Sequence, residues 1–259
     1  MPELGAGALA LLVVGATLAG AVNAVAGGGS LISFPALLAV GYPALTANIT
    51  NTVALCPGYI GGTIGYRHEL TGQRGRVIAL SATSVAGALA GSFLLLVSSP
   101  ELFERIVPWL ILLACGLLAV QERLGRFVRS RVGVVERDAG WTRWAPLLVI
   151  QFIAAVYGAY FGAGLGIMML AILGIFLADT LQRLNALKGV MSLVINVVGA
   201  LYFAVFAKVV WLAVAVMAVA SLVGGRIGVA MARRLNDRAL RWLVVVFGVG
   251  VAVRLMIPG

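Results

Sequence analysis

The sequence contains two glycine clusters, Ala26-Gly27-Gly28-Gly29-Ser30 and Phe161-Gly162-Ala163-Gly164-Leu165-Gly166. Each cluster separates a long apolar segment from a short one, 30–42 in the first case and 166–178 in the second. A helix of about thirteen residues is only about 20 Å long. Glycine at this density interrupts a helix because it loses so much backbone freedom on folding. We therefore predict two helices that are each broken at a glycine cluster.

The composition around these clusters indicates a membrane protein. The chain has 259 residues, of which 62% are hydrophobic and 11% are charged, and its mean hydropathy is +1.07. Soluble domains are about 45–50% apolar and about 25% charged, and no single soluble core could bury this much apolar sequence. These values exclude a water-soluble enzyme and a disordered chain.

Ten apolar segments follow one another along the chain. A helix needs about 20 residues to span a bilayer, and the two segments after the glycine clusters are too short. The segments are 5–26, 30–42, 45–66, 76–98, 103–121, 143–161, 166–178, 181–207, 209–232 and 239–257. We predict an all-α, polytopic membrane protein.

The two halves of the chain resemble each other when residues 11–63 are laid over residues 147–200. With one extra residue allowed in the second copy, the matched pairs are Gly28 and Gly164, Asn48 and Asn185, and Asn51 and Lys188. We interpret the chain as a duplicated unit in which a broken helix pair precedes three long helices. Interrupted helices at matching positions are typical of secondary transporters. The first repeat covers 1–121, a basic linker covers 122–142 and the second repeat covers 143–259.

The nineteen basic residues predict how the chain is oriented in the membrane. If each broken pair is a hairpin that returns to its own side, fourteen basic residues lie on one side and three on the other, with Lys188 and Arg226 inside helices. If each pair crosses once, the split is eleven to six. The hairpin arrangement fits the positive-inside rule better. It makes the repeats inverted, the linker cytoplasmic and both termini extracytoplasmic. The fourteen are positions 67, 74, 76, 123, 126, 129, 131, 137, 143, 183, 233, 234, 238 and 241, and the three are 105, 208 and 254.

The glycine clusters are the first candidates for a substrate site. Irregular backbone in a bilayer is tolerated only where protein or a water-filled cavity surrounds it. Helices that begin at Ser30 and Gly166 point N–H groups and positive dipole ends toward the breaks, which suits an anion. The alternative is that the glycines only allow close helix packing, which we prefer for the pairs at 61–62 and 224–225. The candidate residues at the clusters are Gly28, Gly29, Ser30, Gly164 and Gly166.

A polar stripe on the helix predicted at 181–207 is the second candidate. Its residues recur at spacings of three, four and four, so they share one face of an otherwise apolar helix. A lysine inside a membrane helix normally faces a cavity or a partner, although the stem of Lys188 could also reach an interface. A cation flanked by amide and hydroxyl groups predicts an anion site. The stripe consists of Asn185, Lys188, Ser192 and Asn196, and the equivalent face of the first repeat carries Asn48, Asn51, Leu55 and Tyr59.

Two further polar residues lie next to predicted helix ends. Asn23 precedes the first glycine cluster by about one turn, where it would either line a cavity or cap the broken helix. Asp179 directly precedes the segment 181–207, and acids are favoured at helix N-termini. We expect Asp179 to cap that helix.

No residue pattern predicts a cofactor. His68 is the only histidine, and Cys56 and Cys115 lie in apolar segments outside any metal-ligand spacing. No Walker sequence is present. The net charge of +10 is expected to face anionic lipid rather than nucleic acid. The expected partners are a small anion and the lipid bilayer, and the sequence leaves open whether the chain forms a homo-oligomer.

Several stretches of the sequence, including both glycine clusters, resemble the TauE/SafE family of sulfite and organosulfonate transporters. The resemblance lies in the stretch 21–37 around the first glycine cluster, in Ala47-Asn48-Ile49-Thr50-Asn51-Thr52, in the second cluster followed by Asn185-Ala186-Leu187-Lys188, and in Gly224-Gly225-Arg226-Ile227-Gly228. It extends over essentially the whole chain. It implies an inner-membrane carrier that moves small sulfur oxyanions, such as sulfite or C2 organosulfonates, often outward.

The sequence as a whole predicts a secondary carrier rather than an enzyme. The anion would bind between the two glycine breaks, and one repeat would rock against the other in alternating access. An anion channel, or a carrier of a carboxylate, sulfate or thiosulfate, would use the same residues. A membrane scaffold would use the polar stripe for packing alone.

Overall fold

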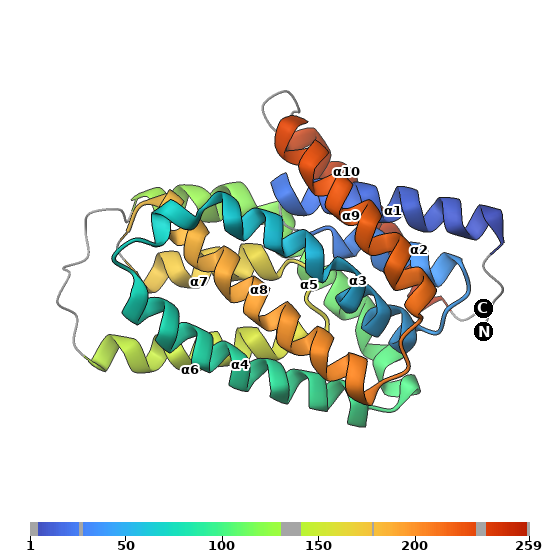
Figure 1. The fold of residues 1–259 in the computed structure, drawn as a ribbon, viewed down its shortest axis with the longest axis horizontal. Helices are drawn as coiled ribbons and strands as arrows, with labels where there is room; N and C mark the ends of the chain where they lie inside the picture. The colour runs from blue at the N-terminus through green and yellow to red at the C-terminus, as the bar shows by residue number, and fades with distance from the viewer. Residues whose placement is uncertain (1–4, 26–27, 131–140, 178, 232–236, 258–259) are drawn as a thin grey trace.

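The computed structural model describes residues 5–25, 28–130, 141–177, 179–231 and 237–257. Within these ranges every regular element is a helix (Figure 1). The helices are α1 (Ala6–Val25), α2 (Ser30–Ala39), α3 (Ala44–Gly65), the 3₁₀ helix η1 (Arg67–Leu70), α4 (Arg74–Val97), α5 (Pro100–Ser130), α6 (Trp141–Tyr160), α7 (Leu165–Phe176), α8 (Leu181–Phe206), α9 (Trp211–Met231) and α10 (Asp237–Met256).

Each predicted apolar segment corresponds to one α-helix, and most boundaries agree within three residues. The exception is α5, which we predicted over 103–121 and which continues to Ser130. The residues after the apolar part include Glu, Arg and Leu, all of which favour helix whether polar or apolar. The first part of the predicted linker at 122–142 is therefore helical. Residues 131–140 of that linker lie outside the described residues.

Several helices have the length and the surface of membrane-spanning segments. Large apolar side chains face outward, among them Trp109, Val205 and Val246, which are 66%, 72% and 68% exposed. Lipid accommodates such a surface, whereas in water it would be a patch for association. The chain is thus a multi-pass membrane protein. The described spans that are long and apolar enough to cross are Ala6–Asn23, Arg74–Val97, Pro100–Leu124 and Leu181–Phe206.

Two helix pairs, each with one helix from each half, pack through glycine in the same way. α1 lies along α9, and α6 lies along α4. A Cβ on Gly224 would meet the backbone carbonyl of Thr17, and a Cβ on Gly91 would meet that of Val156. The prediction that the pair at 224–225 allows close packing is confirmed. The packing around the glycines at 61–62 lies outside the described part of the chain.

The first broken pair is a hairpin. The Cβ position of Gly29 at the start of α2 meets the backbone of Ala19, and that of Gly15 lies 2.9 Å from the Cβ of Ala36. Contacts therefore run from the end of α1 back toward its beginning as α2 proceeds. α2 folds back antiparallel along α1.

The third helices of the two halves, α3 and α8, lie side by side and point in opposite directions. Near the start of α3, Thr50 Oγ1 accepts a hydrogen bond of 3.3 Å from the backbone N–H of Val210, just after α8. Beyond the end of α3, the carbonyl of Thr71 accepts one of 3.1 Å from Arg183, near the start of α8. The 26 residues of α8 extend about 39 Å. The connections after α3 and after α8 therefore lie at opposite ends of the molecule.

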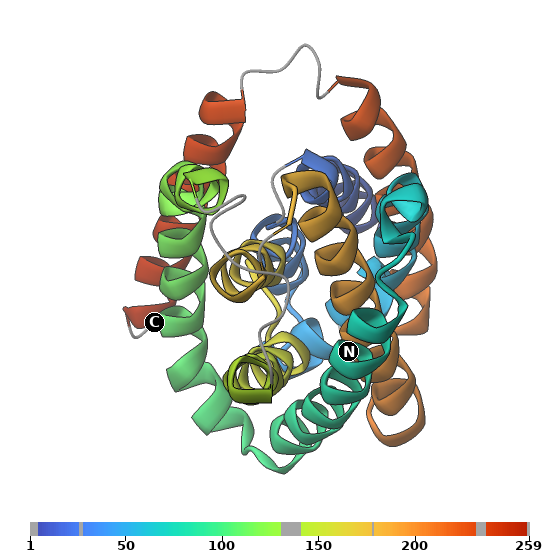
Figure 2. The same ribbon diagram turned by 90° about the vertical axis from the view of Figure 1, so that its left-hand side faces the viewer.

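The apolar core has two parts. One is formed mainly by α4, α6, α7 and α8, and the other mainly by α1, α2, α3, α5, α9 and α10. In Figure 1 the first group lies on the left and most of the second on the right. α5 and α10 pack together along one flank (Figure 2). The second glycine break lies where these two parts meet, because Phe161 belongs to one part and Leu165 to the other.

Candidate functional site

The two glycine breaks approach the same stretch of α5. A Cβ built on Gly28 would lie 3.7 Å from the side chain of Leu118, and one built on Gly164 would lie 3.4 Å from the Cα of Ala114. Leu118 and Ala114 are one helical turn apart. The prediction that the breaks of the two repeats come together agrees with this arrangement.

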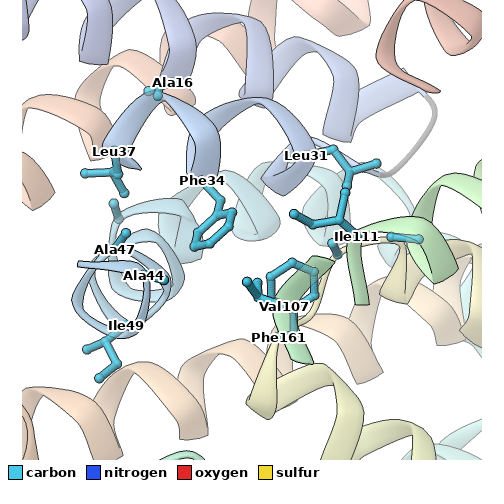
Figure 3. Packing of buried hydrophobic residues seen from close by; sticks show 14 of the residues in the cluster. Ala16, Leu31, Phe34, Leu37, Ala44, Ala47, Ile49, Val107, Ile111 and Phe161 are labelled. Atoms are coloured by element: carbon cyan, nitrogen blue, oxygen red, sulfur yellow. The ribbon is translucent and has the colours of Figure 1, made fainter. Parts of the chain in front are cut away.

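An aromatic pair joins the two breaks directly. Phe34 on α2 and Phe161 at the second break meet edge to face, with ring centroids 5.6 Å apart and planes at 86°. Figure 3 shows these rings with Leu31 above and Val107 and Ile111 of α5 beside them. All five side chains are buried. An apolar contact therefore holds the two broken pairs together next to the polar groups of the site.

Asn23 caps the first break. Its Oδ1 accepts hydrogen bonds of 3.0 Å from the backbone N–H groups of both Gly28 and Gly29. The sequence left open whether Asn23 lines a cavity or caps the broken helix, and this contact is a cap. Ser30, the first residue of α2, is 8% exposed. The N–H groups of two candidate residues of the first break, Gly28 and Gly29, are thus bound to the side chain of Asn23.

The second break is built by glycines in the left-handed region. Gly162 and Gly164 have φ values of 74° and 73°, which residues other than glycine rarely adopt. The chain reverses here, and the hydroxyl of Tyr157 holds the turn by donating to the carbonyl of Ala163 at 2.6 Å. A glycine-rich turn of this kind exposes successive N–H groups and forms an anion-binding concavity.

The backbone N–H groups at the second break are only partly used. Leu165 and Ile167 donate to the carbonyls of Gly162 and Gly164, at 3.2 and 3.0 Å. The N–H of Gly166 has no hydrogen-bond partner in the part of the chain that the structure describes. Gly166 is also partly exposed. The second break therefore has an N–H group at the start of α7 without a partner among the described residues.

Lys188 lies beside this open donor. Its Cδ is 3.8 Å from the position that a Cβ on Gly166 would occupy. The side chain is partly exposed. Among the described residues it has neither a hydrogen bond nor an ion pair. α7 and α8 thus bring an unpaired cation and an open N–H group to one place.

The rest of the stripe on α8 is neutral. Asn185 is partly exposed, and Ser192 and Asn196 are buried. Asn196 Nδ2 donates to the backbone carbonyl of Ser192 at 2.8 Å. The hydroxyl of Ser192 is buried without a hydrogen-bond partner in the described chain. Lys188 is therefore the charged member of a face of amides and hydroxyls.

Two buried asparagines of α3 complete the set of predicted residues. Asn48 Nδ2 donates to the carbonyl of Tyr160 at 2.8 Å, so it caps the end of α6 just before the second break. Asn48 and Asn51 are 1% and 2% exposed. The Oδ1 atoms of both have no partner among the described residues. The first repeat thus supports the break of the second repeat through Asn48.

Tyr59 is a residue of this region that we did not predict as part of the site. It lies on α3 next to the side chains of Asn23 and Asn196. Asn23 belongs to the first break and Asn196 to the polar stripe of α8. The alignment of the repeats pairs Tyr59 with Asn196, and this signal could have identified it.

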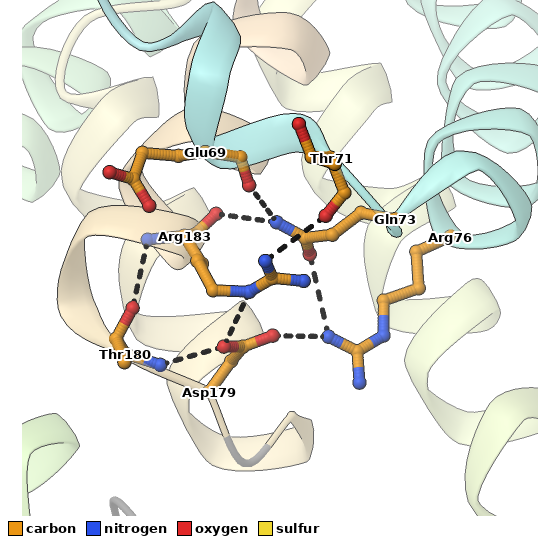
Figure 4. Close-up of polar contacts among 7 residues, drawn as sticks. All are labelled: Glu69, Thr71, Gln73, Arg76, Asp179, Thr180 and Arg183. Carbon is orange, nitrogen blue, oxygen red and sulfur yellow. Dashed lines mark hydrogen bonds and ion pairs between the residues drawn. The ribbon is translucent and has the colours of Figure 1, made fainter.

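A separate polar cluster joins the two halves at one end of α8 (Figure 4). Asp179 forms ion pairs with Arg76 at 2.6 Å and with Arg183 at 2.8 Å. Gln73 donates to the carbonyls of Glu69 and Arg183, at 2.9 and 3.4 Å. The connection between α3 and α4 is thereby bound to the connection between α7 and α8.

Asp179 does not cap α8 as we predicted. The N-cap residue is Thr180, whose Oγ1 accepts from the backbone N–H of Arg183 at 3.4 Å. Asp179 instead accepts from the N–H of Thr180 and pairs with both arginines. Burial alone would raise the pKa of Asp179, but hydrogen bonds from Arg183, Thr180 and Arg76 hold it below its usual value. Arg183 and Thr180 are close to Asp179 in sequence, whereas Arg76 is brought to it from α4 by the tertiary fold.

Comparison with known proteins supports one family. The family model described as "Sulfite exporter TauE/SafE" matches residues 12–255. A relative from Sinorhizobium sp, "Probable membrane transporter protein ORF9", is 26% identical over 99% of this chain and 95% of its own length. "Probable membrane transporter protein YfcA" of Escherichia coli K12 is 25% identical over 96% of this chain and 89% of its own. No solved structure matches the chain.

A third relative extends the same pattern. "Probable membrane transporter protein" of Haemophilus influenzae is 24% identical over 94% of this chain and 92% of its own length. The match to the family covers both glycine breaks and, at least in part, each of the described helices α1 to α10. With its lipid-facing helices and this family match, the chain is a membrane transporter of the TauE/SafE family and not an enzyme.

Proposed function

We propose that the protein is a secondary carrier for small sulfur oxyanions, such as sulfite or C2 organosulfonates, and that it exports them across the inner membrane. The substrate anion binds at the second glycine break. It is held by the ammonium group of Lys188 and the N–H of Gly166, with the amide of Asn185 beside them. The description of the matched family as a sulfite exporter supports the substrate class.

The observation that carries this proposal is the pairing of Lys188 with Gly166. The Cδ of Lys188 lies 3.8 Å from the position that a Cβ on Gly166 would occupy. The N–H of Gly166 has no hydrogen-bond partner among the described residues. Hydrogen bonds between ionised and neutral groups are about twice as strong as neutral ones. A sulfonate or sulfite offers several oxygens, so it can accept from both donors at once.

Inverted repeats would let the carrier expose this site to either side. The opposite directions of α3 and α8 support an axis in the membrane plane, because equivalent helices of parallel repeats would point the same way. The equivalent pairs α1 with α9 and α6 with α4 support the duplication. Rocking of one repeat against the other would then move the substrate across.

The position of the polar cluster supports the orientation. Arg76 and Arg183 share Asp179, so they lie on one side of the membrane. The hairpin arrangement, with its fourteen basic residues on one side, requires this proximity, whereas a single crossing of each broken pair separates the two arginines. By the positive-inside rule this side is cytoplasmic, and both termini are extracytoplasmic.

Counterflow in liposomes tests the proposed function. Purified protein is reconstituted, and uptake of labelled sulfite and labelled isethionate, a C2 sulfonate with one negative charge, is measured against an internal excess of the same anion. We expect saturable counterflow of at least one of them. In Lys188→Met the affinity falls about ten- to hundredfold, as expected for loss of a charged hydrogen bond.

Lys208→Met is the matched control, because Lys208 is exposed in the connection between α8 and α9. It should transport like the unmodified protein. Thermal unfolding of each variant in detergent shows whether it is folded. Unchanged transport by a folded Lys188→Met protein would contradict the proposed site, and linear, non-saturable flux would indicate a channel.

A further inference from the structure

Lys188 carries a positive charge that no acid on its own helix face balances. The stripe around it, Asn185, Ser192 and Asn196, contains amides and a hydroxyl and no acid. The ion pairs of the described residues are those of Asp179, which lies more than two turns before Lys188 and is already shared by Arg76 and Arg183. The protein itself therefore supplies no negative charge to Lys188 within the described residues.

The positions of the other acidic side chains that the structure describes lead to the same result. Glu69 lies in η1, and Glu101 and Glu104 lie in the first turns of α5, at the ends of helices. Glu122 lies within α5 and has an interaction of its own there. Among the acidic side chains that the structure describes, none balances Lys188, so we assign that role to solvent when the site is open, or to a bound anion.

Alternating access requires the site to close before it reopens on the other side. When an anion is bound, the closed site is neutral. When it is empty, closure removes water from an unpaired ammonium group inside the membrane, which is strongly unfavourable. The loaded carrier therefore crosses readily, and the empty carrier crosses slowly.

We infer that the protein is an anion exchanger: its return step requires a second anion with a single negative charge to neutralise Lys188. This inference rests on the proposed function and deepens it by naming what is carried in the opposite direction. The exported anion leaves, and another small oxyanion enters in its place. The exchange moves no net charge when both anions carry one charge.

The experiment compares exchange with net efflux in the same liposomes. Vesicles are loaded with labelled isethionate, and the membrane potential is held at zero with equal potassium on both sides and valinomycin. Efflux is then measured into medium that contains either unlabelled isethionate or only gluconate as a bulky balancing anion. We expect efflux into isethionate to be about tenfold faster or more, because only the loaded carrier returns readily.

Two variants assign the effect to the charge. Lys188→Arg keeps the charge and should keep the ratio of exchange to net efflux. Lys188→Gln removes the charge, so any remaining transport should show a ratio close to one. Lys208→Gln, with its exposed position after α8, should behave like the unmodified protein.

The ratio for the unmodified protein decides the inference. If net efflux is as fast as exchange, the protein is a carrier but not an exchanger, and the proposed function stands alone. If Lys188→Gln keeps a high ratio, Lys188 is not the origin of the coupling and the inference is overturned. If neither sulfite nor isethionate moves in any mode, both the proposed function and the inference fail.

Discussion

Neighbouring glycines at the second break have different roles. Gly164 has a φ of 73°, so its conformation requires glycine. Gly166 is the second residue of α7, in regular helix, and a Cβ there would make an ordinary contact of 3.8 Å with Lys188. Gly166 is therefore a position where a methyl group fits the fold but occupies the space beside the proposed site.

We predict that Gly166→Ala folds and binds its anion less well. The methyl group would lie 3.8 Å from the Cδ of Lys188, so it would take up space that an anion needs to contact both donors. The concentration for half-maximal counterflow should rise about tenfold, equivalent to about 1.4 kcal/mol. The measurement is the initial rate as a function of anion concentration.

Gly116→Ala is the control for this substitution. Gly116 is exposed on α5, and a Cβ there would meet nothing within 4 Å. This variant should be slightly more stable, by about 0.5–1 kcal/mol, since alanine favours helix, with unchanged transport. Equal transport by Gly166→Ala and Gly116→Ala would remove Gly166 from the proposed site.

At the scale of elements, the polar cluster joins parts of the chain that are distant in sequence. Arg183 donates to the carbonyl of Thr71, and Arg76 pairs with Asp179. Asp179 is 13% exposed at its side chain, while the arginines are 28% and 29% exposed. Water therefore screens the acid less than it screens its partners. The cluster is expected to stabilise the contact between α4 and α8 at this end.

We predict that Asp179→Asn destabilises the protein near neutral pH by about 1–2 kcal/mol, because it removes the charge from hydrogen bonds with two arginines. The pKa of Asp179 is lowered by folding. Its stabilising contribution is therefore complete above the ordinary carboxyl pKa of about 3.9 and is lost as the pH falls through the lower folded value. Thermal unfolding in detergent at pH 7 and at decreasing pH measures the difference.

Glu104→Gln provides the comparison for Asp179→Asn. Glu104 is an exposed acid of α5, so its loss should change the unfolding temperature little. The difference in unfolding temperature between Asp179→Asn and the unmodified protein should become smaller in acid. A gap that is constant from pH 7 into strong acid would mean that the charge of Asp179 does not stabilise the fold.

At the scale of the whole molecule, the two halves are packed by equivalent contacts. α1 lies on α9 as α6 lies on α4, and glycine brings the backbones together in both pairs. Equivalent connections, after α3 and after α8, lie at opposite ends. The arrangement predicts that these two connections face different compartments.

Labelling of introduced cysteines tests this prediction. His68→Cys places a thiol in η1, after α3, and Lys208→Cys places one after α8, both at exposed positions. In intact cells, a thiol reagent that cannot cross the membrane should label position 208 from outside and position 68 only after permeabilisation. The unmodified protein controls for Cys56 and Cys115. Labelling of both positions from the same side would contradict inverted repeats.

Much of the architecture could be predicted because lipid imposes simple rules. The apolar segments correspond to the ten α-helices, since a membrane requires long apolar helices with internally paired backbone. The prediction failed at the end of α5, where helix propensity continued beyond the apolar segment. It failed again at Asp179, because Arg76 binds it from a distant helix.

The sequence by itself determined the helices, the glycine breaks and the family, because hydropathy and glycine spacing act locally along the chain. The tertiary structure decided which side chains lie at each break. Asn23 occupies the N–H groups of Gly28 and Gly29, whereas Gly166 keeps its N–H and lies beside Lys188. The two breaks look alike in sequence. They differ because hydrogen bonding depends on which side chains the packed helices bring within about 3 Å.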